Sequence, residues 1–201
     1  DNVINDIFEK LKIKSNYKKR KKSIEVFNKK NQILKKGIAI TPVKFGISFT
    51  TTHLNQGGAL VHIYTDGSLH LNHGGIEMGQ GLMTKLALIA SNEFGLNYKS
   101  IKISSTDTEK VPNTSASAAS ATTDINGGAI INAINKIKSN LNEFIYDHYK
   151  TNSYIRYHND HVFFDKRKIL FKDLINVAYL NRVPLSSSGF FKTSKINVNK
   201  K

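Results

Sequence analysis

The 201-residue sequence has no cysteine, no long hydrophobic run and only half as many acidic as basic residues. The absence of cysteine excludes disulfides, zinc–thiolate sites and iron–sulfur ligation by this chain itself. No apolar run approaches the roughly 20 residues that a membrane-spanning helix needs. The first segment is a polar helix and not an apolar signal sequence, so we expect a cytoplasmic protein without membrane contact.

The shortage of acidic residues leaves a formal net charge of +15. Such an excess can attract nucleic acid or another anionic partner, or it can be lysine spread over solvated faces. The densest basic cluster is Lys18, Lys19, Arg20, Lys21 and Lys22. No aromatic side chain interleaves with this cluster to stack on bases. We therefore expect no nucleic-acid binding, although a basic surface would help to attract anionic substrates and cofactors.

The hydrophobic spacing predicts a mixture of helices and hairpins. Residues 2–31 have helical spacing and predict an amphipathic helix pair. Asp66-Gly67 lies between β-prone runs and predicts a two-residue type I′ turn, which places His62 and His70 on opposite faces of the hairpin. The other expected elements are β-prone stretches at 37–40 and 44–49, a strand at 101–103, helices at 82–94, 118–149 and 173–180, and a hairpin of 162–164 with 169–171. Hairpins without regular βαβ alternation predict an α+β fold.

The chain is expected to be one partial domain in three parts. These parts are a basic helical lead-in at 1–36, a core at 37–150, and a hairpin, helix and terminal segment at 151–201. The sequence begins with Asp1 instead of Met and ends at Lys201, soon after a strand-like segment. We therefore expect a fragment of a longer subunit.

The first segment that could carry chemistry is glycine-rich, His73-Gly74-Gly75-Ile76-Glu77-Met78-Gly79-Gln80-Gly81. Its glycines let the backbone approach a flat or charged ligand, and the following helix would present unpaired N–H groups. The segment is neither a phosphate-binding loop nor a dinucleotide fingerprint, and a tight strand-to-helix turn explains the glycines equally well. We expect Glu77 to hold this loop by accepting backbone N–H bonds.

The second segment, Pro112–Asp124, is almost entirely small and hydroxylated. Small side chains admit a bulky cofactor, and Ser or Thr can cap a helix N-terminus that faces an anion. A flexible linker is the alternative, but a linker would not normally join a strand to a long amphipathic helix. Neither an HExxH motif nor a paired-carboxylate or Ser–His–Asp arrangement is present, so we expect no histidine metal site.

Together these segments resemble the xanthine dehydrogenase family. The similarity runs through "EVFNKKNQILKKGIAITPVKFGISF", "LNQGGALVHIYTDGSLHLNHGGIEMGQGL", "DTEKVPNTSASAASATTDINGGA" and "VAYLNRVPLSSSGFFKT". The chain looks most like the separate molybdenum-binding subunit of bacteria. The resemblance implies part of a molybdopterin-binding domain, in which the pterin dithiolene holds molybdenum, and this agrees with the lack of cysteine.

The resemblance also implies roles for particular residues. The implied cofactor-binding residues are Met78, Gly79, Gln80, Ala119, Ser120, Ala121 and Thr122. Ala119 would lie nearest molybdenum without supplying a side-chain ligand. Phe49 would pack on a purine ring and Thr50 would offer a hydroxyl, which suits a flat heteroaromatic substrate. Ile76 departs from the family pattern, which usually has Thr at that position.

An activity and partners follow from the same resemblance. The family hydroxylates hypoxanthine and xanthine to urate, and electrons pass through 2Fe-2S clusters and FAD to NAD. The resemblance places FAD and the clusters on a partner subunit or domain of a hetero-oligomer. It places the catalytic glutamate, a substrate-binding arginine and a Gly-Gly-Phe-Gly loop outside residues 1–201, which leaves no catalytic residue here. Open alternatives are a sibling molybdenum hydroxylase acting on an aldehyde or another heteroaromatic compound, and an inactive binding remnant.

Overall fold

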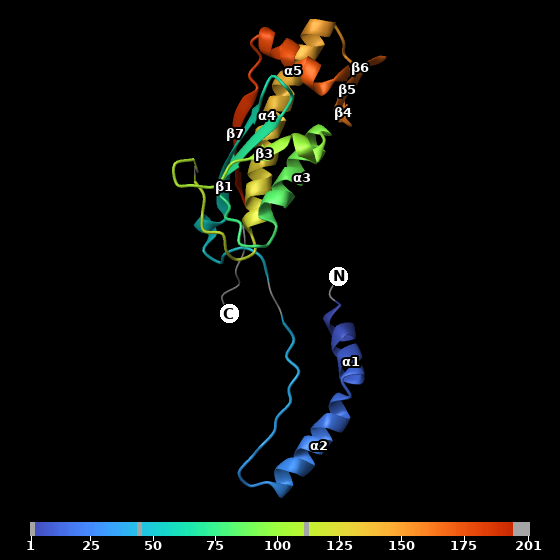
Figure 1. The fold of residues 1–201 in the computed structure, drawn as a ribbon, viewed down its shortest axis with the longest axis vertical. Coiled ribbons are helices and arrows are strands. Elements are labelled where there is room, and N and C mark those ends of the chain that lie inside the picture. The colour runs from blue at the N-terminus through green and yellow to red at the C-terminus, as the bar shows by residue number, and fades with distance from the viewer. Residues whose placement is uncertain (1–2, 44–45, 111–112, 195–201) are drawn as a thin grey trace. The chain divides into compact units, whose positions relative to one another are not determined.

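The computed structural model describes residues 3–43, 46–110 and 113–194, and the chain divides into two compact units between residues 46 and 47 (Figure 1). The first unit contains helices α1 (Ile4–Lys14) and α2 (Tyr17–Lys30), which confirm the expected helix pair. Neither helix has a buried residue, so their apolar side chains have no core of their own. The expected three-part division of the chain stays a prediction.

The second unit has the expected α+β fold, with a four-stranded sheet in the order β3-β2-β1-β7. The strands are β1 (Gln56–Ile63), β2 (Leu69–His73), β3 (Ile101–Ile103) and β7 (Ser186–Lys192). Strand β1 pairs antiparallel with β2 and β7, whereas β2 and β3 are parallel. Helices α3 (Leu82–Phe94) and α4 (Thr122–Tyr149) pack beside each other against this sheet (Figure 1).

A smaller antiparallel sheet and one more helix extend the same core. The sheet has the order β4-β5-β6, and α5 follows it. The elements are β4 (Arg156–His158), β5 (His161–Phe164), β6 (Arg167–Leu170) and α5 (Phe171–Leu180), with short 3-10 turns η1 (Thr52–Leu54) and η2 (Tyr98–Ser100). Phe164 and Phe171 join Phe94 of α3 in one continuous cluster of buried side chains. No helix in the described ranges is long and apolar enough to cross a membrane.

The β1–β2 hairpin is confirmed, but the expected two-residue turn is wrong. Ile63 pairs with Leu69, and the Tyr64 N–H donates to the Ser68 carbonyl, which leaves the three residues 65–67 in the loop. Only Gly67 in this loop has a positive φ, +83°, as in a type I turn that ends in a left-handed glycine. One extra loop residue shifts the register by one position. His62 therefore pairs directly with His70, and the two rings share a face, contrary to the expectation.

Two other sequence expectations need correction. Helix α4 begins at Thr122 and not near Ala118, because Ala119 and Ser120 have left-handed backbones with a φ of 53° that no helix can include. The β-prone stretches 37–40 and 46–49 form no strand, since no neighbouring strand pairs with them. Residues 44–45 of the second stretch, Pro112 and the terminal residues 195–201 lie outside the described residues.

Candidate functional site

The glycine-rich loop leads from β2 into α3 and is shaped by the side chains of Glu77 and Gln80. Glu77 accepts hydrogen bonds from the backbone N–H groups of Gly79 and Gly81 through one oxygen, at 2.9 and 3.0 Å, and from Met83 through the other at 3.0 Å. These donors lower the pKa of the Glu77 carboxyl, the Met83 N–H contributing most. The expected structural role of Glu77 is thereby confirmed.

Gln80 bonds to the same loop through both ends of its side-chain amide. Its Oε1 accepts from the Met78 N–H at 2.6 Å, and its Nε2 donates to the Ile76 carbonyl at 2.9 Å. Residues 76–81 are therefore a compact turn that is closed on itself, although every side chain from Ile76 to Gln80 is exposed. An exposed turn with fixed geometry can present its backbone to a ligand.

The base of this loop is held by the buried side chains of His73 and Asn126. His73 is 1% exposed, its Nδ1 accepts from the Gly75 N–H at 3.1 Å, and its Nε2 lies 3.3 Å from the Met83 sulfur. The proton of the ring therefore resides on Nε2. Burial lowers the pKa of His73 and favours this neutral form. Asn126 of α4 accepts from the Gly74 N–H at 3.2 Å, which ties the loop to the start of the long helix.

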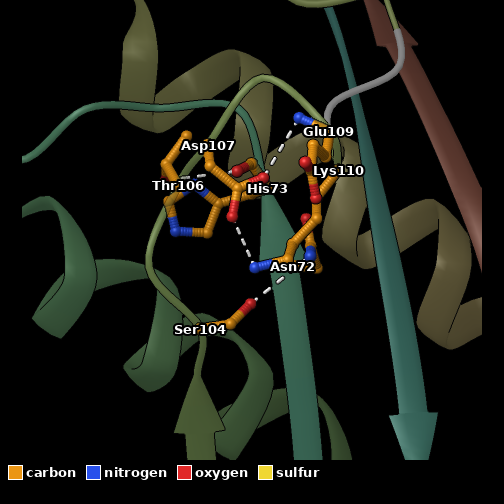
Figure 2. A network of polar contacts seen from close by, with 7 residues as sticks. All are labelled: Asn72, His73, Ser104, Thr106, Asp107, Glu109 and Lys110. Carbon is orange, nitrogen blue, oxygen red and sulfur yellow. Dashed lines mark hydrogen bonds and ion pairs between the residues drawn. The ribbon is translucent and has the colours of Figure 1, made fainter.

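A polar network joins the end of β2 to the segment that follows β3 (Figure 2). The Thr106 hydroxyl donates to the carbonyls of His73 and Gly75, at 3.3 and 2.8 Å, and Asn72 donates to the Ser104 hydroxyl at 3.3 Å. Asp107 caps the next turn by accepting from the Glu109 N–H and the Lys110 ammonium. Sequence reasoning assigned no role to His73 or Thr106, because their partners are backbone atoms brought close only by the fold.

The small-residue loop, residues 113–121, meets the glycine-rich loop, residues 74–81 (the glycine loop), at Ser117. The Ser117 hydroxyl accepts from the Ile76 N–H at 2.7 Å. Beyond it, Ala119 and Ser120 are consecutive left-handed residues, and Ala121 precedes α4 without a side-chain cap. The expected Ser or Thr cap is therefore wrong. Left-handed conformations away from glycine cost about 1–3 kcal/mol each and cluster at ligand sites, where the surrounding structure enforces them.

Both loops line one cavity of about 390 Å³, a size typical of sites for small organic ligands. Its lining residues are Met78, Gln80, Lys85, Ser117, Ala118, Ala119, Ser120, Thr122 and Thr123. The structure thus brings together Met78 and Gln80 from one predicted segment with Ala119, Ser120 and Thr122 from the other. Gly79 lies in the same turn but does not line the cavity, and Ala121 is buried and lines a smaller cavity instead.

Backbone donors and one cation give this cavity the character of an anion site. The N–H groups of Ala119, Ser120, Thr122 and Thr123 have no acceptor within the described part of the chain. Two of them belong to the first turn of α4, where the helix dipole favours negative charge. Lys85, from the second turn of α3, adds a positive charge that the sequence interpretation missed.

Phe49 lies beside the small-residue loop, in a second and narrower cavity. That cavity shares Ala118 and Thr122 with the larger one, so the two are adjacent. The Phe49 backbone is bonded on both sides by the buried Asn55 side chain. Thr50 is exposed and lines neither cavity, so the structure does not bring its hydroxyl into the site. Among residues 3–43, 46–110 and 113–194 there is no cluster of three potential metal-ligating side chains.

Two solved structures share this fold. Quinoline 2-oxidoreductase from Pseudomonas putida 86 superposes with a TM-score of 0.63 at 19% identity, over 69% of this chain and 19% of that one. Carbon monoxide dehydrogenase from Oligotropha carboxidovorans gives a TM-score of 0.61 at 20% identity, over 68% of this chain and 18% of that one. The fold is therefore that of one domain within much larger enzymes.

The sequence makes the assignment specific: the chain belongs to the molybdopterin cofactor-binding domain family, whose model matches residues 10–201. It is 41% identical to the xanthine dehydrogenase of Dictyostelium discoideum over 98% of this chain, and 45% identical to the xanthine dehydrogenase/oxidase of Gallus gallus over 92%. The chain spans only 12–13% of the length of these relatives. These relatives are eukaryotic, and the expected likeness to a separate bacterial subunit stays a prediction.

Proposed function

We propose that this chain forms one wall of the molybdopterin and substrate site of an enzyme of the xanthine dehydrogenase type. The observation that supports this proposal is the shared cavity of about 390 Å³, which is lined by Met78 and Gln80 on one side and by Ala119 and Ser120 on the other. The sequence places these segments about 40 positions apart, and each alone fits an ordinary turn. Their convergence on one cavity favours a common ligand.

The donor set of the cavity fits a phosphorylated pterin. Four unpaired backbone N–H groups and Lys85 offer hydrogen bonds and positive charge to a phosphate, and the small side chains let the backbone approach a flat ring. No thiolate or imidazole is available there, so the metal ligands would come from the dithiolene of the cofactor. When bound, that cofactor would supply the redox chemistry for hydroxylation of a heteroaromatic ring by oxygen from water.

In this proposal the protein groups bind and orient. Met78, Gly79 and Gln80 would hold the pterin, while Ala119, Ser120, Ala121 and Thr122 would face the metal side, with Ala119 nearest molybdenum. Phe49 would pack on the purine, and Thr50 would need a rearrangement of its exposed segment to reach it. The proposed substrates are hypoxanthine and xanthine. FAD and 2Fe-2S centres on a partner domain or subunit of a cytoplasmic hetero-oligomer would carry electrons to NAD.

The test is made on the full-length protein that contains this region. We expect purified protein to contain molybdenum and a fluorescent oxidised pterin, and to form urate from xanthine. A protein that forms no urate but oxidises aldehydes would redirect the substrate assignment to a sibling hydroxylase. Protein without molybdenum or pterin, after expression with ample molybdate, would overturn the proposal.

The Gln80→Ala variant tests the glycine loop. Loss of both amide hydrogen bonds frees the turn from Ile76 to Met78, so molybdenum per protein should fall severalfold. Asn132→Ala is the matched control, because the Asn132 amide also donates to a backbone carbonyl, that of Phe190, but lies outside the cavity. Equal molybdenum content in the two variants would contradict the role assigned to Gln80.

A further inference from the structure

Asn55 is an almost fully buried polar residue, 1% exposed, at the entry to β1. Its side-chain Oδ1 accepts from the Phe49 N–H at 2.8 Å, and its Nδ2 donates to the Phe49 carbonyl at 2.7 Å. One amide group therefore satisfies both backbone groups of Phe49, as a neighbouring strand would. Because residues 46–50 belong to no helix or strand, this pair of bonds replaces the missing sheet partner.

The backbone of Asn55 is itself fixed in the sheet. Its carbonyl accepts from the Thr193 N–H at 3.1 Å, just after β7 ends, and its N–H donates to the Thr52 carbonyl at 3.0 Å. The carbonyl of the preceding residue, Leu54, accepts from the Ser115 hydroxyl of the small-residue loop. Asn55 is thus held by the scaffold, whereas Phe49 is held by Asn55.

Phe49 is linked just as directly to the other side of the cavity. The N–H of the preceding residue, Ser48, donates to the Ala119 carbonyl at 2.9 Å. Ser48 has a φ of +82°, so the bond joins a left-handed serine to a left-handed alanine. A conformation of this kind persists only where neighbouring bonds enforce it, and it is typical of sites that fix a ligand or a reacting group.

We infer that Asn55 is a positioning residue that sets the Phe49 ring against Ala119 and thereby determines the affinity for a flat heteroaromatic substrate. This inference rests on the proposed function of the cavity. Asn55 does not line the larger cavity and would touch neither substrate nor cofactor. Its contribution passes through the Phe49 backbone. A ring displaced by a fraction of an ångström would lose its contact with the substrate while the cofactor stays bound.

The test compares Asn55→Ala and Asn55→Asp in the full-length protein. Asn55→Ala removes both bonds to Phe49, and kcat/KM for xanthine should fall by about tenfold to a hundredfold, mainly through KM. Asn55→Asp keeps an acceptor for the Phe49 N–H and should recover part of the loss. Molybdenum content should be unchanged in both. Asn142→Ala is the control, since Asn142 accepts from the Tyr157 hydroxyl far along α4 and should leave KM unaltered.

Amide hydrogen exchange supplies a readout that needs no activity. In the unmodified protein the Phe49 N–H should exchange slowly although it lies outside regular structure, and Asn55→Ala should abolish that protection. A freely exchanging Phe49 amide in the unmodified protein would overturn the inference, even if a variant fails to fold. So would an unchanged KM in a folded Asn55→Ala. A protein without molybdenum refutes the proposed function, whereas a molybdenum-loaded protein with these exchange or KM results refutes only the role of Asn55.

Discussion

At the scale of single residues, the cavity depends on a few polar side chains that bond to backbone atoms. Glu77 and Gln80 close the glycine turn, Asn126 anchors its base, and Asn55 holds Phe49. Lys85 differs from these because its ammonium makes no hydrogen bond or ion pair within the described residues. An unpaired cation on a ligand cavity is free to bind an anionic group.

Replacing Lys85 with Gln should weaken retention of an anionic cofactor. A charge-assisted hydrogen bond contributes about 1.5–3 kcal/mol, so we expect at least about a tenfold loss of affinity. The measurement is molybdenum retained after gel filtration at low and high salt. Lys85→Arg keeps the charge and should retain most of the binding. Identical retention by the Gln and Arg variants would show that charge at this position is unimportant.

His73 should make stability depend on pH in a defined direction. Burial holds the pKa of His73 below its ordinary value of 6.5, so the native state resists the proton that the unfolded chain accepts. The full contribution of the neutral His73 side chain to the free energy of unfolding is present above pH 6.5. This contribution is lost as the pH falls from there toward the lowered pKa. Urea unfolding at several pH values should show a shallower acid slope in His73→Gln. Because burial also lowers the pKa of His70, His70→Gln is the necessary comparison.

At the scale of secondary-structure elements, strand β7 lies unusually close to α4. A Cβ atom added to Gly189 would stand 1.9 Å from the Ala129 carbonyl oxygen and 2.6 Å from the Ala133 nitrogen, both fixed helix backbone. Only glycine lets the edge strand reach the helix at this point. The contact matters for the site, because α4 carries Thr122 and β7 completes the sheet next to β1.

Gly189→Ala should therefore destabilise the fold through this contact. Overpacking of this kind costs about 1–3 kcal/mol, and contact with backbone places the cost at the upper end. The denaturation midpoint of the variant gives the loss directly. Gly46→Ala is the control, since nothing lies within 4 Å of a Cβ atom at Gly46. A midpoint equal to that of the control would mean that the strand moves away from α4 without cost.

The same elements show what local sequence signals can predict. Helix α3 was predicted with its true bounds, because Gly81 and Gly95 take left-handed conformations at its two ends. The start of α4 was misplaced because nothing in the run from Ala116 to Ala121 signals the first residue of a helix. The left-handed turn in this run is imposed by contacts with Ser48 and the glycine-rich loop. Strand β4 was missed since three residues become a strand only by pairing with β5.

The sequence also predicts part of the lining of the larger cavity. One cavity is lined by Met78, Gln80, Ala119, Ser120 and Thr122, and their role in cofactor binding stays a prediction. Lys85, Asn55 and His73 were missed, because their roles depend on partners distant in sequence or on a neighbouring turn of helix. Residues that support a site leave no local pattern, so a fold is needed to find them.

At the scale of the whole molecule, one face of the large sheet carries exposed apolar side chains in the part of the chain that the structure describes. The helices pack on the other face, and Leu60, Tyr64 and Phe190 are 44%, 47% and 43% exposed on this one. A patch of this kind marks a contact surface or an aggregation risk. Since the chain spans about an eighth of its relatives, we expect other parts of a longer protein to cover this face.

The isolated chain should consequently self-associate. Light scattering should detect oligomers, and a dye that fluoresces on apolar surfaces should bind. Leu60→Ser combined with Phe190→Ser should reduce both signals. Tyr154→Ser is the control, because Tyr154 is 85% exposed but is not part of this face. A monomeric chain that binds no dye would show that the face tolerates water without a partner.

The register of the β1–β2 hairpin has a consequence at the end of β2 that lies away from the hairpin loop. Alternate residues of β2, starting from Leu69, point toward the core. This alternation places His73 beneath the glycine-rich loop and Asn72 on the opposite face of the sheet. Deleting a single residue of β2 ahead of Asn72 would turn over the rest of the strand and bring Asn72 under the loop in place of the imidazole. The number of residues in β2 between the hairpin and the glycine-rich loop is therefore constrained by the imidazole that must lie under that loop.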